Sequence, residues 1–203
     1  MISALISGLL RICAGSVVRW EGCGPELRQR VYFANHTSNL DGPLLWAALP
    51  PALRARVRLV AAHDYWSVGR LRPYLAKHVF RAVLIERRRP TTANNPIDVM
   101  LEAVGQDGSL IIFPEGGRFA GPEPQPFKAG LYHLAKRRPD LELVPVWMEN
   151  LNRILPKGEV LPVPLLGSLT IGPPLHLQEG ESKAEFLDRA RGALMALSHP
   201  HGC

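Results

Sequence analysis

Short apolar runs alternate with longer helical patterns along this chain, and this alternation constrains the fold more than any other feature. The runs are rich in β-branched residues and too short for helices, so each predicts a strand within a sheet. The alternation predicts an α/β fold: a single domain with a mixed, largely parallel β-sheet flanked by helices. The predicted strands are residues 31–34, 57–61, 83–85, 109–113, 143–147 and 168–171.

Length and composition agree with one globular domain. Of the 203 residues, 46% are hydrophobic and 21% are charged, which is enough apolar surface for one core. The net charge of +6 suits a phosphate-bearing partner such as nucleic acid, an anionic lipid headgroup or a phosphorylated cofactor. Aromatic residues are not interleaved with the basic clusters, so we do not expect nucleic-acid binding. Cys13, Cys23 and Cys203 are widely spaced, and they predict neither a disulfide framework nor a zinc site.

Residues 1–20 carry a pattern of their own, with apolar side chains at helical spacing. The uncharged run over residues 1–10 is much shorter than the ~20 residues that a spanning helix needs. Arg11 follows this run, whereas a signal peptide carries its positive charge before the apolar stretch. We predict an amphipathic helix that lies in a membrane interface with Trp20 at headgroup level; a terminal helix packed on the domain is the alternative. Residues 21–203 form the remaining domain.

A histidine and an aspartate stand five positions apart directly after the first predicted strand. Pro43 marks the first turn of a short helix, so His36 and Asp41 lie on a strand-to-helix turn. There the carboxylate can meet one imidazole nitrogen, which leaves the other free to take a proton from a substrate hydroxyl. A purely structural hydrogen bond between the two side chains is the alternative.

Other polar residues also follow predicted strands, and in α/β sheets ligands bind at the carboxyl ends of the strands. Glu115, Gly116, Gly117 and Arg118 come directly after residues 109–113. Paired glycines allow a ligand to approach the backbone, and an arginine offers a planar fork for phosphate. The alternative is a tight turn whose Glu and Arg pair with each other.

Arg87 follows the strand over residues 83–85, and Lys128 follows a proline-rich loop. Each is either a phosphate contact or a solvent-exposed cation. Pro145 has no backbone N–H, so the strand over residues 143–147 lacks one hydrogen-bond donor at this position. A proline within a strand predicts a sheet edge or a bulge.

Four sequence blocks follow one another along the chain: NHTSNLD at residues 35–41, VLIER at residues 83–87, FPEGGR at residues 113–118 and VPV at residues 144–146. In this order they resemble the blocks of the glycerolipid acyltransferase family, and more narrowly those of the bacterial 1-acylglycerol-3-phosphate (lysophosphatidate) acyltransferases. Residues 127–130, FKAG, resemble the segment that follows the third block in that family. Two positions depart from the family pattern: the family usually has Thr or Ser where this chain has Gly117, and often has Gly where this chain has Arg81.

The resemblance implies a role for each matching residue. His36 would be the general base and Asp41 the residue that orients it. Arg87 and Arg118 would hold the phosphate of the acceptor, and Pro145 would help to form the acyl-donor side. The expected substrate-binding residues are Arg87, Glu115, Gly116, Gly117, Arg118, Lys128 and Pro145.

The resemblance also implies a reaction: an O-acyltransferase that moves a fatty acyl group from acyl-CoA or acyl-carrier protein to the free hydroxyl of a lysophospholipid. No metal or redox cofactor is expected, and the expected location is peripheral or monotopic, at the cytoplasmic face of the inner membrane. Two other interpretations stay open. The first is a non-catalytic domain that binds anionic lipid, and the second is a metal-dependent hydrolase with His36 and Asp41 as ligands.

Overall fold

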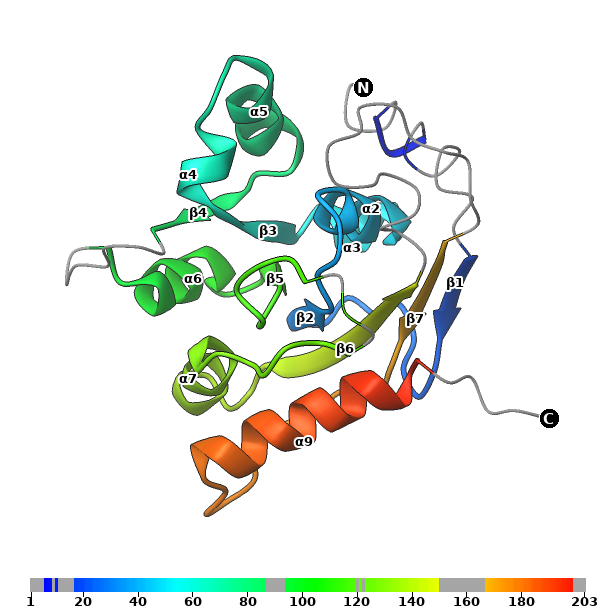
Figure 1. Cartoon of the computed structure of the whole chain (residues 1–203), viewed down its shortest axis with the longest axis vertical. Coiled ribbons are helices and arrows are strands. Elements are labelled where there is room, and N and C mark those ends of the chain that lie inside the picture. The colour runs from blue at the N-terminus through cyan, green and yellow to red at the C-terminus, as the bar shows by residue number, and fades with distance from the viewer. Residues whose placement is uncertain are drawn as a thin grey trace.

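Strands and helices follow one another along the chain and build a sheet that is covered on both faces (Figure 1). The computed structural model describes residues 6–8, 10, 17–86, 94–119, 121, 123–149 and 167–198. The strands are β1 (Val17–Trp20), β2 (Arg30–Ala34), β3 (Val57–Ala62), β4 (Val83–Ile85), β5 (Ser109–Ile112), β6 (Glu142–Glu149) and β7 (Ser168–Ile171). The helices are α2 (Asp41–Ala48), α3 (Pro51–Arg54), α4 (His63–Trp66), α5 (Leu71–Tyr74), the π-helical turn η1 (Leu75–Val79), α6 (Pro96–Val104), α7 (Gly130–Arg137) and α9 (Lys183–Ala196).

The described strands form a single sheet in the order β1-β7-β6-β2-β5-β3-β4. Neighbouring strands run parallel throughout, except that β6 and β7 are antiparallel. The expected α/β class, with a mixed and largely parallel sheet flanked by helices, is therefore confirmed. Because β2, β3, β4 and β5 are parallel, their carboxyl ends lie along the same edge of the sheet.

Strand β2 lies inside the sheet, between β5 and β6, and all five of its residues are buried. Its side chains alternate between the two faces, since Tyr32 and Ala34 belong to one hydrophobic cluster and Val31 and Phe33 to the other. A strand packed on both faces needs apolar residues at every position. This explains why the sequence shows a continuous apolar run here instead of an alternating one.

The two hydrophobic clusters correspond to the two helical layers. Helices α2 and α3 cover one face, and α6, α7 and α9 cover the other (Figure 1). Local signals start two of these helices: the Asn95 side chain accepts from the N–H of Ile97 before α6, and Ser182 and Glu185 form a reciprocal capping box at the start of α9. Such caps satisfy backbone donors that a helix leaves free at its first turn.

The prediction for residues 1–20 is wrong at its end, because Val17–Trp20 is strand β1, paired in parallel with β7. A helix there would leave the exposed edge of β7 without its partner. Of the earlier residues, 6–8 and 10 are helical, and the rest of the predicted interfacial helix lies outside the described residues. Within the described part of the chain, we find no helix with the length and apolar character to cross a membrane.

Of the two alternatives predicted at Pro145, the sheet edge is wrong, because β6 has neighbours on both sides. The bulge agrees with the structure, because one extra residue separates the pair Val146–Ile171 from the next pair, Leu143–Leu175. Pro145 lies where the ladder to β7 ends. The N–H of Gly172 donates to the Pro145 carbonyl at 2.9 Å, and the next pairing along β6 is an isolated bridge from Leu143 to Leu175. A residue without an N–H fits at this interruption of the ladder.

Candidate active site

His36 and Asp41 meet at the carboxyl end of β2. The Nδ1 atom of His36 lies 2.9 Å from Oδ2 of Asp41. The His36 side chain is 21% exposed, whereas that of Asp41 is fully buried. The predicted contact between the carboxylate and one ring nitrogen therefore forms, and it leaves Nε2 as the second ring nitrogen.

The oxygen that meets His36 is surrounded by donors. Oδ2 of Asp41 also accepts the backbone N–H groups of Thr37 at 2.6 Å and Ser38 at 2.7 Å. Asp41 is itself the first residue of α2, where the helix dipole favours a negative charge. An oxygen in this position acts as an acceptor, so the ring donates from Nδ1 and Nε2 carries the lone pair. This is the tautomer that a general base requires.

Three further contacts hold His36 in place. Its ring stacks on Phe113, with ring centroids 4.1 Å apart and planes inclined by 21°. Its backbone N–H donates to Oε1 of Glu115 at 2.7 Å, and its carbonyl accepts from the N–H of Phe119 at 2.8 Å. The turn after β5 therefore clamps the turn after β2, although the two are 79 positions apart.

Glu115 connects the turn to a second loop. Its Oε1 accepts from His36 and its Oε2 accepts from the N–H of Gln125 at 2.8 Å. Burial raises the pKa of the Glu115 carboxyl, and the two backbone hydrogen bonds oppose that rise only in part. Both oxygens are occupied by the backbone, so the alternative in which Glu115 pairs with Arg118 is not the arrangement found.

The glycine turn brings a lysine over the site. Gly116 has φ +72°, and a Cβ atom there would lie 2.7–2.8 Å from the Cδ, Cε and Nζ atoms of Lys128. The backbone N–H of Lys128 donates to the Pro114 carbonyl at 2.8 Å, which fixes the start of its side chain. The left-handed backbone therefore favours glycine at 116, and the end of the Lys128 side chain would have to shift to make room for a Cβ atom.

The two departures from the family pattern have structural counterparts. A Cβ at Gly117 would meet nothing within 4 Å, so the Thr or Ser expected there would fit. Arg81 has φ +46°, a left-handed conformation that favours glycine. The position where a glycine is often expected is therefore one where the backbone calls for it.

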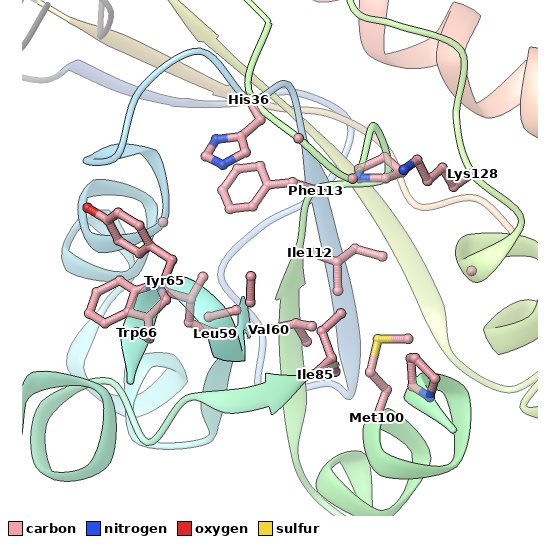
Figure 2. A pocket seen from close by; sticks show the side chains of 18 of the residues that line it. His36, Leu59, Val60, Tyr65, Trp66, Ile85, Met100, Ile112, Phe113 and Lys128 are labelled. Carbon is pink, nitrogen blue, oxygen red and sulfur yellow. The ribbon is translucent and has the colours of Figure 1, made fainter. Parts of the chain in front are cut away.

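A cavity of about 350 Å³ opens beside these residues (Figure 2). This volume lies within the usual range of small-molecule sites. His36 and Phe113 lie at one side and Lys128 at another, and aliphatic side chains from the strands and α6 line the interior (Figure 2). The apolar lining is suited to a hydrocarbon chain. It includes Leu59, Val60, Ala61, Trp66, Ile85, Ile97, Met100, Ile112 and Leu131.

Five of the predicted site residues line this cavity, and Asp41 lies directly behind one of them. Glu115 is outside its lining but holds the backbone of His36. Pro145 lies within β6 and is not among the lining residues. Arg87 is outside the described residues. The five lining residues are His36, Gly116, Gly117, Arg118 and Lys128.

Several lining residues were not predicted as site residues. Phe113 opens the third sequence block, but its place at the end of an apolar run is typical of a core residue, and no role at the site was predicted for its ring, which supports the imidazole. Tyr65 and Trp66 come from α4, and Met100 comes from α6. Their side chains reach the cavity only because α4 and α6 pack beside the ends of β3 and β5, which no local pattern reports.

The donor atoms for a metal ion are limited in the described part of the chain. His36 and Asp41 bond each other, and no group of three or more His, Cys, Asp or Glu side chains gathers there in a way that could hold a metal ion.

The fold is similar to that of a solved enzyme structure. The crystal structure of the 1-acyl-sn-glycerophosphate (LPA) acyltransferase PlsC from Thermotoga maritima matches with a TM-score of 0.71 and 20% sequence identity. The match covers 96% of this chain and 78% of that chain. At this identity the likeness establishes a shared fold.

The sequence identifies the family. Residues 24–149 match the sequence profile of the Acyltransferase family, a stretch that runs from the polar connection before β2 to the end of β6. The chain belongs to the Acyltransferase family, as its four sequence blocks predicted.

Two curated relatives carry more specific names. They are the 1-acyl-sn-glycerol-3-phosphate acyltransferases of Limnanthes douglasii and Limnanthes alba, each 32% identical to this chain over 168 residues. The aligned region is 79% of this chain and 56% of each relative. The chain thus spans about half the length of the curated relatives it matches.

Proposed function

We propose that this protein is an O-acyltransferase that moves a fatty acyl group from an acyl thioester to the free hydroxyl of a lysophospholipid such as 1-acylglycerol-3-phosphate. The observation that carries the proposal is the 2.9 Å contact between His36 Nδ1 and Asp41 Oδ2 beside an apolar cavity. Membership of the Acyltransferase family and the names of the Limnanthes relatives support it. The donor is acyl-CoA or acyl-carrier protein.

His36 acts as the general base. Its Nε2 takes the proton of the acceptor hydroxyl while the hydroxyl oxygen attacks the thioester carbonyl carbon. The tetrahedral intermediate then collapses, the carbon–sulfur bond breaks, and the thiolate leaves with the proton that the imidazolium returns. An ester and a free thiol result, without a covalent enzyme intermediate. Asp41 stabilises the imidazolium in between, and base catalysis of this kind is worth about 10²–10⁴-fold.

The acceptor phosphate binds to cations beside the glycine turn. Arg118 lines the cavity, and the Lys128 side chain crosses Gly116. A guanidinium offers a bidentate contact to phosphate and an ammonium adds a compact charge. We assign Arg87 to the same phosphate because it belongs to the second sequence block, which resembles that of the family. The hydrocarbon chain of a substrate occupies the apolar part of the cavity.

The enzyme works at a membrane, where a lysophospholipid and its acylated product both reside. A peripheral or monotopic location at the cytoplasmic face of the inner membrane suits an acyl-CoA or carrier-protein donor. No metal or redox cofactor takes part, because each step needs only a proton transfer and the two substrates.

The test is release of free thiol from palmitoyl-CoA in detergent micelles, with and without lysophosphatidate. Wild-type protein should release thiol only when the acceptor is present, and His36→Ala should lower that rate by about 10²–10⁴-fold. His133→Ala is the matched control, since His133 is exposed on α7. It should keep the wild-type rate.

Other outcomes decide against the proposal. Equal rates for wild type and His36→Ala would exclude His36 as the base. Binding of lysophosphatidate without turnover of any thioester donor, carrier-protein donors included, would indicate a lipid-binding domain. Hydrolytic activity that a chelator abolishes and a divalent ion restores would indicate a metal-dependent hydrolase.

A further inference from the structure

The segment between β3 and β4 exposes large hydrophobic side chains to solvent. Val68 is 56% exposed, Leu71 68% and Tyr74 44%, which makes them three of the six exposed large hydrophobic residues in the described part of the chain. They lie within seven positions of one another, beside the exposed cations Arg70 and Lys77. We call these five residues the α4–α5 face.

The opposite side of the same segment is firmly anchored. The ring of Phe80 packs edge-to-face against Trp46 of α2 at 5.2 Å and against Trp66 of α4 at 5.8 Å. Ala76 and Val79 are buried. The exposed residues are therefore held on a fixed support, and their exposure does not result from loose packing of the segment.

The charge of this segment is mostly positive, and its one acidic residue, Asp64, lies in the first turn of α4. Between Tyr65 and Ile85 the sequence contains four basic residues and neither Asp nor Glu. Exposed apolar residues flanked by cations suit an anionic bilayer, where basic side chains reach the headgroups and Tyr lies at the interface. The four basic residues are Arg70, Arg72, Lys77 and Arg81.

The segment that carries the α4–α5 face also lines the cavity, through two residues of α4. Tyr65 and Trp66 line the cavity on the side of α4 (Figure 2). The guanidinium of Arg72 lies 4.3 Å from the Tyr65 ring centroid, and that of Arg118 lies 6.0 Å from the same ring. Helices α4 and α5 extend beyond the strands that they connect (Figure 1). A bilayer against this face would thus be next to the site of the acceptor phosphate.

We propose that the α4–α5 face docks on the surface of an anionic lipid bilayer and presents the cavity to it. The inference deepens the proposed function, on which it rests for a lipid acceptor. It adds a lipid contact that is separate from residues 1–20 and that the four sequence blocks do not contain.

The test is sedimentation of the full chain with sucrose-loaded vesicles of phosphatidylcholine, with or without phosphatidylglycerol. Removing Leu71 from the interface by Leu71→Ser should weaken binding to the mixed vesicles about tenfold, since an exposed Leu gains free energy on leaving water. Arg70→Gln with Lys77→Gln should weaken it about 30-fold, because each cation near an anionic surface contributes about fivefold. On pure phosphatidylcholine this double variant should bind like wild type.

Matched controls use comparable residues elsewhere. Leu27→Ser changes a Leu that is 53% exposed, and Arg56→Gln changes an exposed cation at the opposite end of β3 from α4. Both should bind mixed vesicles like wild type.

Vesicle binding is measured without turnover, so its result stands whether or not the acyltransferase reaction is found. If the α4–α5 variants bind mixed vesicles as well as the controls do, the docking surface is refuted while the proposed function is untouched. If Leu71→Ser instead abolishes self-association in analytical ultracentrifugation with vesicle binding unchanged, the face is a protein interface and the proposal is wrong.

Discussion

Asp41→Asn separates the charge of the dyad from its geometry. Oδ2 of Asp41 accepts three N–H groups, from His36, Thr37 and Ser38, and an amide oxygen in its place can accept the same three. The amide nitrogen would then take the place of Oδ1, which is buried without a hydrogen-bond partner among the described residues. The histidine should keep its orientation and tautomer, and only the negative charge should be lost.

The size of the effect follows from the distance. For unit charges 2.9 Å apart, Coulomb's law with an effective dielectric constant of about 20 gives about 6 kcal/mol. This is an upper bound on what the carboxylate contributes to a fully formed imidazolium, and it corresponds to about 10⁴ in rate. Because the charge is only partly developed in the transition state, we expect kcat to fall by about 10²–10⁴-fold with little change in KM.

The assay is acceptor-dependent thiol release, with kcat and KM determined separately for the lysophosphatidate acceptor. Urea unfolding of the same preparations checks the fold. An amide nitrogen left without an acceptor should lower the free energy of unfolding by no more than about 1–3 kcal/mol. The control is Asp98→Asn, the same chemical change at a half-exposed carboxylate that pairs with Arg137 on the surface; it should keep wild-type kinetics.

A folded Asp41→Asn protein with a kcat within about threefold of wild type would refute this reasoning, because the dyad charge would then contribute less than 1 kcal/mol to the barrier. A rise in KM at constant kcat would also refute it, since the carboxylate would then act in binding only.

Two further predictions concern the turn after β5. Gly116→Ala should lower the free energy of unfolding in urea by about 1–2 kcal/mol, because φ is +72° there. The control is Gly192→Ala in α9, where a Cβ meets nothing within 4 Å, and it should not destabilise the protein. Equal changes in unfolding free energy for the two variants would show that the turn is not strained. The second prediction concerns pH. Burial raises the pKa of the Glu115 carboxyl above its ordinary 4.5, so this carboxyl stays protonated to higher pH in the folded state than in the unfolded state. The stability that the protonated Glu115 contributes is complete below about pH 4.5 and is lost as pH rises through the raised pKa. Wild type should therefore lose unfolding free energy over this window relative to Glu115→Gln, and parallel pH profiles of the two proteins would contradict the assignment.

The local parts of the site could be predicted from the sequence because they depend on neighbours in the chain. His36 and Asp41 are five positions apart on a turn after a strand whose apolar run is unmistakable. Their contact needs only that turn, and the structure has it at 2.9 Å. The capping box at Ser182 is equally local, and it forms as the pattern predicts.

Long-range parts of the site could not be predicted in this way. The support of His36 by Phe113 and Glu115 depends on β2 and β5 being neighbours in the sheet. A hydrophobic run specifies that a strand is buried but not which strand lies beside it. The sequence could not decide between an edge and a bulge at Pro145 for the same reason, since its position beside a gap in the β7 ladder is a property of the pairing.

The sequence by itself determined the α/β class, the four family blocks and the residues of the dyad, because periodicity, turn chemistry and motif spacing are all local. Only the tertiary structure decided the order of the strands, the clamp on His36 and the walls of the cavity, to which α4 contributes Tyr65 and α6 contributes Met100. It also decided which apolar residues remain on the surface, such as Leu71. The physical reason is that hydrophobic burial is non-directional: it drives every apolar run inward, and the packing of the whole chain settles which of them meet and which stay exposed.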